Sequence, residues 1–292
     1  MKLLNNTTVL VLALAGGLSS SAHAAQIFAL TTTNSLVSFD SATPGTTTPV
    51  LAITGLQPLE RLLGIDFRPA TGQLYSVGTT SQVYLLNTTT GAATAVGGPF
   101  SPVVTGTNFG LDFNPTVDRI RLVSDAGQNL RLNPTTGVAI TDTALAFAAG
   151  DLNFGNSPFV VGAAYTNNVN GALSTTLYDI DSRAGILAIQ NLPNAGTLNT
   201  VGSLGVATTG LVGFDISGAD GTAFASLTSV AGTPRLYTIN LATGAATNIG
   251  VIGGGTLGIS DISVVPIPEP SSLVLGGLGL AGLLAWRRKR AA

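Results

Sequence analysis

The sequence predicts an all-β protein, a β-propeller of five blades with four antiparallel strands each, and two observations carry this prediction. First, a unit led by a glycine recurs at intervals of 46, 52 and 51 residues, with its glycines at Gly64, Gly110, Gly162 and Gly213. Second, each unit contains short runs of β-forming residues separated by glycine, proline, asparagine and threonine, which is typical of strands and turns. A period of this length indicates propeller blades.

The first segment, residues 1–24, is predicted to be a secretory signal peptide. Lys2 precedes the apolar run VLVLALAGGL, and small residues follow up to Ala22 and Ala24. This order of charge, apolar run and A-x-A site is that of a cleaved export signal. We therefore expect signal peptidase to act before Ala25 and the mature domain to span residues 25–265.

The domain begins with an incomplete blade. Residues 26–54 match the last three strands of a unit but lack the leading strand. Residues 258–262, with the sequence GISDI, resemble the missing strand and follow the last complete unit. A ring closed by pairing this strand with the first three leaves no exposed sheet edge. Six blades remain an alternative if residues 148–158 contain further strands.

The unit that starts at Leu62 shows the four strands most clearly, as LGIDF, QLYSVG, QVYLLN and AATAVG. A turn of Asn or Asp, three residues and Gly recurs between the third and fourth strands, at residues 87–91, 133–137, 181–185 and 240–244. Glycine there supplies the positive φ of a tight hairpin, and Asn or Asp can accept hydrogen bonds within the turn. We interpret these residues as hairpin chemistry.

The last segment, residues 266–292, carries a sorting signal. It contains Pro268, Glu269 and Pro270, then a glycine-rich apolar run, then the four cations Arg287, Arg288, Lys289 and Arg290. The apolar run is short for a transmembrane helix, and the cations would stay cytoplasmic. This combination resembles a PEP-CTERM tail. The resemblance implies processing by an exosortase, transient anchoring in the inner membrane, and a cell-surface or extracellular destination in a Gram-negative host that makes exopolysaccharide.

The domain itself resembles a known family. The strings DRIRLVSDAGQNLRLNPTTG from Asp118 and LYDIDSRAGILAIQNLPNAGTLNTVG from Leu177 are similar to a bacterial propeller-like family filed as a domain of unknown function, DUF4394. The resemblance spans nearly the whole domain and implies the propeller fold. It implies no activity.

Composition excludes several functions. The chain contains no cysteine, and its single histidine and single tryptophan, His23 and Trp286, lie in the terminal segments. Nucleophilic triads and pairs that need His or Cys are thereby excluded from the domain, as are His/Cys zinc sites and haem ligation. Five of the cations and one acid lie in the terminal segments, which leaves seven basic and thirteen acidic residues, a net charge of −6. Such a surface argues against nucleic acid as a partner.

Three aspartates recur at one place in the unit. Asp66, Asp112 and Asp215 occupy the same position of the predicted innermost strand, facing the ring axis. They are weak candidates for catalysis or for holding a metal ion. The alternative is an architectural role, in which each caps a backbone turn or pairs with an arginine of its repeat, such as Arg68 or Arg121. We favour the architectural role because equivalent repeat positions usually serve the repeat.

Arginines gather in the third blade. Arg119, Arg121 and Arg131 form the one locally basic region, and strand alternation places Arg119 and Arg121 on one face. They could bind a carboxylate or sulfate of an acidic polysaccharide. Neutralisation by Asp112, Asp118 and Asp125 is the alternative, and we favour it.

Two further acidic pairs are weaker candidates. The loop from Asp215 to Asp220 resembles an oxygen-ligand calcium loop but misses its spacing, so calcium is only a weak cofactor candidate. Asp179 and Asp181 alternate onto one face of a strand, which suits either metal binding or a solvated edge.

These features favour an exported, non-catalytic binding or structural propeller, associated with exopolysaccharide or another surface protein. The alternatives are a glycan-acting enzyme that uses Asp or Glu, and a calcium-stabilised adhesive module. We expect no cofactor. Fold alone does not separate these functions.

Overall fold

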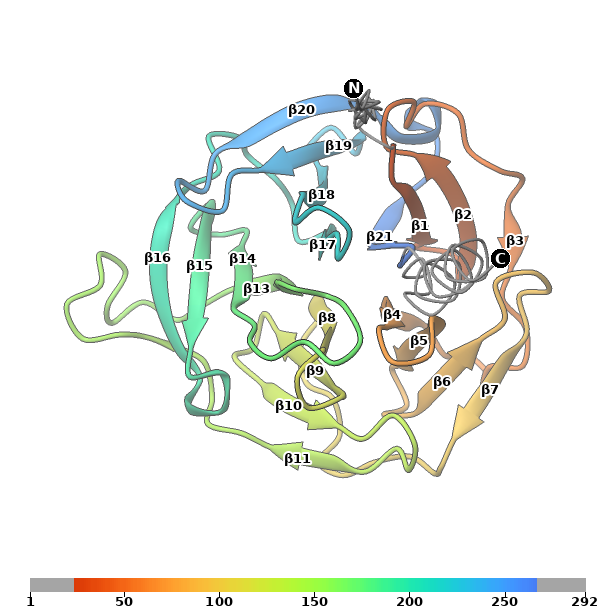
Figure 1. Ribbon diagram of the computed structural model, residues 1–292, viewed down its shortest axis with the longest axis horizontal. Helices are drawn as coiled ribbons and strands as arrows, with labels where there is room; N and C mark the ends of the chain where they lie inside the picture. The colour runs from red at the N-terminus through yellow and green to blue at the C-terminus, as the bar shows by residue number, and fades with distance from the viewer. Residues whose placement is uncertain (1–23, 267–292) are drawn as a thin grey trace, which may run out of the picture.

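The computed structural model describes residues 24–266 and arranges them as five small β-sheets in a ring (Figure 1). The predicted fold class, a five-bladed propeller, is confirmed. Within the described residues, helix is limited to two short 3₁₀ segments, η1 (Pro193–Ala195) and η2 (Ile252–Gly255). None of these described segments is long and apolar enough to cross a membrane. The predicted signal peptide and the predicted tail helix lie outside the described residues.

Each blade is an antiparallel sheet whose strands follow one another from the axis outward. Blade 2 contains β4 (Leu62–Arg68), β5 (Gln73–Gly78), β6 (Val83–Leu86) and β7 (Ala93–Val96). Blade 3 contains β8 (Phe109–Asn114), β9 (Arg119–Ser124), β10 (Asn129–Leu132) and β11 (Ala139–Thr141). Blade 5 contains β17 (Val212–Ile216), β18 (Ala223–Thr228), β19 (Pro234–Ile239) and β20 (Ala246–Val251). Blade 4 contains β13 (Val160–Tyr165), β14 (Leu177–Asp181), β15 (Ile186–Asn191) and β16 (Thr197–Ser203).

Blade 1 closes the ring, as the sequence predicted. It combines β1 (Gln26–Thr31), β2 (Ser35–Asp40) and β3 (Leu51–Ala52) with the C-terminal strand β21 (Ile259–Val264) at the axis. β21 pairs antiparallel with β1, with Phe28 opposite Ser263. Figure 1 shows the last strand, in blue, lying beside the first strand, in red. Because β21 pairs with β1, the inner edge of β1 is not left unpaired.

The alternative of six blades is wrong. Residues 148–158 form a loop of turns and bends without a strand of their own. Just before that loop, β12 (Ala146–Phe147) adds to the outer edge of blade 4 as a short parallel strand beside β16. The segment therefore widens an existing blade, because two residues are too few to form a separate sheet.

The inner strands pack tightly around the axis, and the leading glycines make this possible. A Cβ atom on Gly110 would lie 2.6 Å from the backbone nitrogen of Ala163 in the next blade. A Cβ atom on Gly213 would lie 2.3 Å from the backbone nitrogen of Ile262. Real Cβ contacts are longer than this, so the glycines let neighbouring inner strands approach closely.

The recurring Asn-x-x-x-Gly turns form the predicted hairpins. The Asn87 side-chain oxygen accepts hydrogen bonds from the backbone N–H groups of Thr89 and Thr90, both at 2.9 Å, and Gly91 has φ 74°. Such a positive φ carries little steric cost for glycine. The prediction that these residues serve turn geometry is confirmed. However, residues 181–185 connect β14 and β15, the second and third strands of blade 4, and not the third and fourth strands as predicted.

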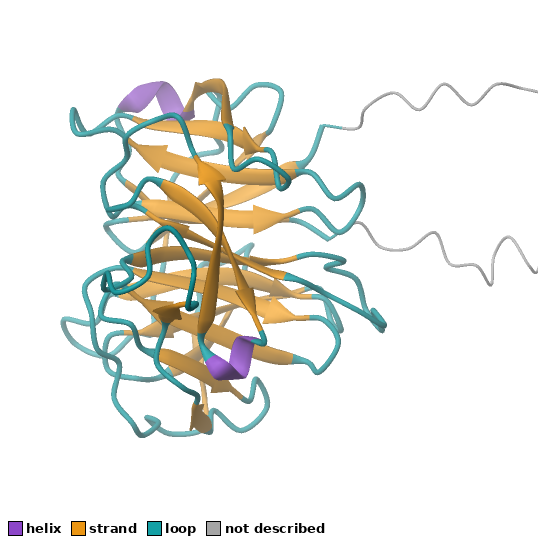
Figure 2. Ribbon diagram, turned by 90° about the vertical axis from the view of Figure 1, so that its left-hand side faces the viewer, coloured by secondary structure: helices purple, strands orange, loops and turns teal. Residues whose placement is uncertain are grey.

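All five inner strands run in the same direction along the axis, because each blade repeats the same order of strands. Figure 2 shows the ring from the side, with loops beyond both ends of the strands. The ring therefore has a start face, where the inner strands begin, and an end face, where they finish. Apolar side chains of neighbouring blades fill the space between the sheets; one such cluster contains Val77, Leu111, Phe113, Ile120 and Leu130. This packing holds the loops of both faces on a rigid frame.

Candidate functional site

The three repeated aspartates meet at the axis. Asp66, Asp112 and Asp215 lie near the middle of β4, β8 and β17, and each is almost completely buried. One oxygen atom from each can be chosen so that the three lie within 4.8 Å of one another. The structure thus brings together the residues that the sequence proposed.

Each of these carboxylates is bonded to the following blade. Asp66 accepts a hydrogen bond from the backbone N–H of Phe113 at 2.8 Å, and Asp112 accepts one from that of Tyr165 at 2.6 Å. Asp215 accepts one from the backbone N–H of Val264 at 2.6 Å. Every acceptor therefore connects its own inner strand to the next one around the ring.

Blades 1 and 4 vary this pattern. In blade 1, Ser263 takes the place of the aspartate: its hydroxyl accepts from the backbone N–H of Phe67 at 3.1 Å and donates to Asp66 at 2.7 Å. In blade 4 the place is taken by Ala164, which has no side-chain acceptor. Arg68, one expected partner of an aspartate in its own repeat, instead forms an ion pair with Asp118 of the next blade.

The axial carboxyls are held in an environment that favours their protonated forms. Burial raises the pKa of Asp215 to about 8, and the neighbouring Asp66 charge adds to this effect. Burial, together with the charges of Asp66 and Asp215, raises the pKa of Asp112 well above its usual value. Burial also raises the pKa of Asp66, against the hydrogen bonds that it receives. Three like charges so close together cannot all ionise at low cost.

The axial group offers little to a metal ion or a substrate. Five of the six oxygens of Asp66, Asp112 and Asp215 already accept hydrogen bonds, and only Oδ1 of Asp112 has no partner within residues 24–266. Calcium takes six to eight oxygen ligands. The other proposed calcium residue, Asp220, lies at an exposed turn and accepts from the backbone N–H of Thr222. These contacts favour an architectural role for the axial carboxylates.

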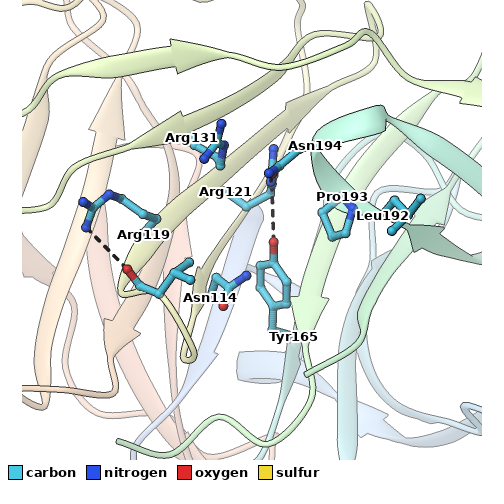
Figure 3. Close-up of a pocket in the computed structure, with 9 residues that line it drawn as sticks. Asn114, Arg119, Arg121, Arg131, Tyr165, Leu192, Pro193 and Asn194 are labelled. Carbon is cyan, nitrogen blue, oxygen red and sulfur yellow. Dashed lines mark hydrogen bonds between the residues drawn. The ribbon is translucent and has the colours of Figure 1, made fainter. Parts of the chain in front are cut away.

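The arginines of blade 3 lie around one pocket. Arg119, Arg121 and Arg131 line a cavity of about 420 Å³ between blades 3 and 4 on the end face of the ring (Figure 3). The two inner strands contribute Asn114 and Tyr165 at their ends, and the segment η1 contributes Asn194.

The neutralising partner differs from the prediction. Nη1 of Arg121 and Nε of Arg131 each donate to Oδ2 of Asp142 at 2.7 Å. Of the expected partners, Asp112 lies at the axis, Asp118 pairs with Arg68, and Asp125 accepts hydrogen bonds from Asn108. The reason is local: Asp142 directly follows β11, which pairs with β10 and places this carboxylate beside the arginines.

Arg121 and Arg131 both form hydrogen bonds within the domain, but they differ in exposure and in the number of their partners. Arg121 is 2% exposed and donates to Asn129, Asn194, Asp142 and the Tyr165 hydroxyl, so its guanidinium is fully used. Arg131 is partly exposed and donates to both oxygens of Asp142.

Arg119 is different, because its guanidinium contacts no carboxylate among residues 24–266. It donates only to the backbone carbonyl oxygens of Val117 at 3.4 Å and Asp118 at 2.8 Å. Three guanidinium groups against one carboxylate leave an excess of two positive charges around the pocket. In a domain of net charge −6, this is a local concentration of positive charge.

Sequence reasoning missed the other polar residues of the pocket. Tyr165 ends the sequence GAAY of blade 4 and stands where blades 2 and 3 have Phe67 and Phe113, so the change from phenylalanine to tyrosine was a signal in the sequence. Asn194 and Asp142 lie in connecting segments that carry no repeat pattern, and nothing in the sequence pointed to them.

Asp179 and Asp181, proposed as a metal pair or a solvated edge, are both buried, so the solvated edge is wrong. Asp181 accepts hydrogen bonds from the backbone N–H groups of Phe159 and Ala184. Neither oxygen of Asp179 has a hydrogen-bond partner within the described chain. Burial raises the pKa of Asp179 to about 8, against the attraction of Arg121 and together with the repulsion of Asp181.

The closed ring of five blades, with its hydrogen-bonded axial carboxylates and its basic pocket, defines a β-propeller domain. Residues 35–263 match the family described as a domain of unknown function, DUF4394, and the chain belongs to this family. Residues 266–290 match the PEP-CTERM protein-sorting motif, which implies an exported protein that is anchored in the membrane transiently and processed by an exosortase.

Solved structures with a similar shape are distant. A provisionally named 6-phosphogluconolactonase from Bacteroides uniformis shares 12% identity at a TM-score of 0.42, covering 79% of this chain and 83% of that chain. Another from Bacteroides fragilis shares 16% at 0.42, covering 82% and 70%. A Bacteroides thetaiotaomicron protein of unknown function shares 14% at 0.47, covering 85% and 68%. No curated protein shows significant sequence similarity to this chain.

Proposed function

We propose that this exported propeller is a non-catalytic binding protein that associates with acidic exopolysaccharide through the pocket between blades 3 and 4. The observation that carries the proposal is Arg119, a cation at the rim of a sugar-sized cavity with no carboxylate partner in the described chain. A carboxylate of a uronic acid residue would supply that partner.

The remaining side chains suit the rest of such a ligand. Guanidinium groups bind carboxylates with strong, charge-assisted hydrogen bonds, so the acid group would pair with Arg119 and with the solvent-facing side of Arg131. Asn114 and Asn194 offer amide groups for the hydroxyl groups of the sugar, whereas the Tyr165 side chain is buried and its hydroxyl accepts from Arg121. Leu192 and Pro193 provide apolar surface for the sugar ring.

The rigid position of Arg121 supports this role. It holds Asn194 and Tyr165 from blade 4 and Asn129 and Asp142 from blade 3, so it fixes both walls of the pocket. A pocket that needs little reorganisation loses less binding energy to ordering.

The alternative of a glycan-acting enzyme finds less support. A glycoside hydrolase needs two carboxyls on either side of an accessible bond. Asp66, Asp112 and Asp215 are almost completely buried, and each accepts a hydrogen bond from the backbone of the next blade. The pocket nearest the axis is walled by Leu63, Phe109 and Leu211.

In the proposed route through the cell, residues 1–24 are removed by signal peptidase, residues 25–265 form the propeller, and residues 266–292 are the tail that the exosortase processes. The destination would be the cell surface or the extracellular matrix of a Gram-negative bacterium. There the propeller would meet the polysaccharide it binds, or another surface protein that presents it.

Binding of polygalacturonate, a polymer of uronic acid residues, to purified residues 25–265 tests the proposal, with uncharged dextran as the control ligand. We expect saturable binding of polygalacturonate only, weakening as salt screens the ion pair. Arg119→Ala should weaken it about tenfold to a hundredfold, because a hydrogen bond to a charged group is worth about 1.5–3 kcal/mol.

Arg235→Ala is the matched control, because it removes the same charge from β19 and Arg235 lines neither this pocket nor the axial one. Equal binding by the wild type and Arg119→Ala, or equal weakening by the two arginine variants, would refute this pocket as the site.

A further inference from the structure

A second pocket lies at the axis, on the other face of the ring. Its cavity of about 210 Å³ is lined by residues from four blades, most of them at or just before the beginnings of the inner strands, and by Thr32, which follows β1. These include Thr32, Arg61, Asn108, Phe109, Leu211 and Ser260. The first pocket is built from the ends of inner strands, so the two pockets open on opposite faces.

Arg61 gives this second pocket a cation that is free to bind. Its side chain is exposed, and its guanidinium has no hydrogen-bond or ion-pair partner within residues 24–266. Its backbone, by contrast, is held firmly: the N–H of Arg61 donates to the Thr79 hydroxyl, and its carbonyl accepts from the N–H of Thr79. The flanking residue Glu60 is buried and hydrogen-bonded to Tyr84 and Thr80.

The other lining residues provide the polar and apolar surface that a sugar needs. The side-chain nitrogen of Asn108 donates to Asp125, which leaves its carbonyl oxygen without a partner in the described chain. The hydroxyl of Thr32 likewise has no partner among these residues. The buried side chains of Leu63 and Phe109 form an apolar base. Clefts of this kind, apolar with a few convergent polar groups, are typical ligand sites.

Glycines shape the rim of the axial pocket. A Cβ atom on Gly210 would lie 2.5 Å from the Asn108 side chain, and one on Gly258 would lie 2.5 Å from the Thr32 hydroxyl oxygen. The Asn108 side chain therefore lies against bare backbone of blade 5, and the Thr32 hydroxyl against bare backbone of its own blade.

We propose that the axial pocket is a second site for an acidic saccharide residue, and that the propeller thereby cross-links two polysaccharide chains. This inference rests on the proposed function of the first pocket. The inner strands that separate the two pockets have about six residues, and at about 3.3 Å per residue they place the pockets roughly 20 Å apart on opposite faces. One straight stretch of polymer cannot enter both, so each pocket takes a separate chain.

Bivalent binding has a direct consequence for a matrix. A monomer with one site coats a polysaccharide, whereas a monomer with two sites on opposite faces joins neighbouring chains and gains avidity where chains are dense. No oligomer is needed for this activity.

The test is a bridging assay with residues 25–265. Protein is added to polygalacturonate fixed on a surface, and the capture of fluorescent polygalacturonate from solution is measured. The wild type and Arg235→Ala should capture the labelled polymer. Arg61→Ala and Asn108→Ala should still bind the surface through the first pocket, with capture reduced at least tenfold. Tetragalacturonate titration should give two sites for the wild type and one for Arg61→Ala.

The outcomes separate the two proposals. Capture by Arg61→Ala at the wild-type level, or one site in the wild type, overturns cross-linking while leaving the first pocket intact. A tetragalacturonate titration of Arg119→Ala that still gives two sites overturns the proposed function of the first pocket instead. Sedimentation of each variant completes the test: a wild-type dimer that dissociates in Arg61→Ala would also overturn bridging by a single propeller. Thermal unfolding verifies that each variant is folded.

Discussion

Asp179 is the group whose replacement tests the electrostatics of the propeller most sharply. It lies on β14, completely buried, and neither carboxyl oxygen has a hydrogen-bond partner within residues 24–266. Burial raises its pKa from 3.8 to about 8. We consider Asp179→Asn, which keeps the shape of the protonated side chain and cannot ionise.

The expected size follows from linkage. Between pH 3.8 and about 8, the unfolded chain has released the Asp179 proton and the folded chain retains it. Stability contributed by a raised carboxyl pKa is fully present below the unfolded value and is lost as the pH rises through the folded value. Each pH unit in this window therefore costs the wild type about 1.4 kcal/mol relative to Asp179→Asn. At pH 7 the accumulated difference is about 4 kcal/mol.

The assay is urea unfolding of both proteins at several pH values from about 4 to 9. Near pH 4 the two should differ least, because this pH lies just above the unfolded-state pKa of 3.8 and little of the difference has accumulated, so the lowest pH serves as the internal control. The variant should gain on the wild type steadily up to about pH 8. A difference that stays flat over this range would show that folded Asp179 is ionised and that Arg121 compensates its burial.

Two further predictions concern the axis. In urea unfolding, Gly213→Ala should lower the free energy of unfolding by about 1–3 kcal/mol, since its Cβ would lie 2.3 Å from the Ile262 nitrogen. The control Gly98→Ala, with nothing within 4 Å of its Cβ, should stay within about 0.5 kcal/mol of the wild type. Equal stability of the two variants would contradict the close approach of the inner strands. Addition of a chelator should leave the thermal midpoint unchanged, because hydrogen bonds already occupy five of the six axial carboxylate oxygens. A midpoint that falls with chelator and recovers with calcium would instead favour a calcium-stabilised module.

The sequence predicts the ring well because blade architecture repeats. The spacing of Gly64, Gly110, Gly162 and Gly213 reflects one steric requirement, the close approach of neighbouring inner strands, which recurs in blades 2 to 5. Ring closure is also readable, since the first segment lacks a strand and the last segment supplies one. The repeat spacing in the sequence therefore reveals the structural features that the blades share.

The details of the candidate site are not repeated, and the sequence does not reveal them. The partner of Asp66 is a backbone N–H group 47 residues away in the next blade, which can be placed only once the ring geometry is known. The counter-ion of Arg121 and Arg131 depends on where β11 ends. Alternation did indicate that Arg119 and Arg121 share a face, and both line the pocket.

The closing strand of blade 1 has a consequence for the life of the chain. The backbone N–H of Val265 still donates to the Gln26 carbonyl oxygen at 2.9 Å, and the sorting motif matches from residue 266 onward. Everything the ring needs therefore lies before the tail, and cutting the tail removes no strand. A chain that stops short of β21, however, has a gap where its first and last blades should meet, with the β1 edge bare. Ring closure therefore depends on chain length. Only a chain that extends through β21, up to the start of its sorting motif, can close the ring and leave no exposed sheet edge that would favour aggregation.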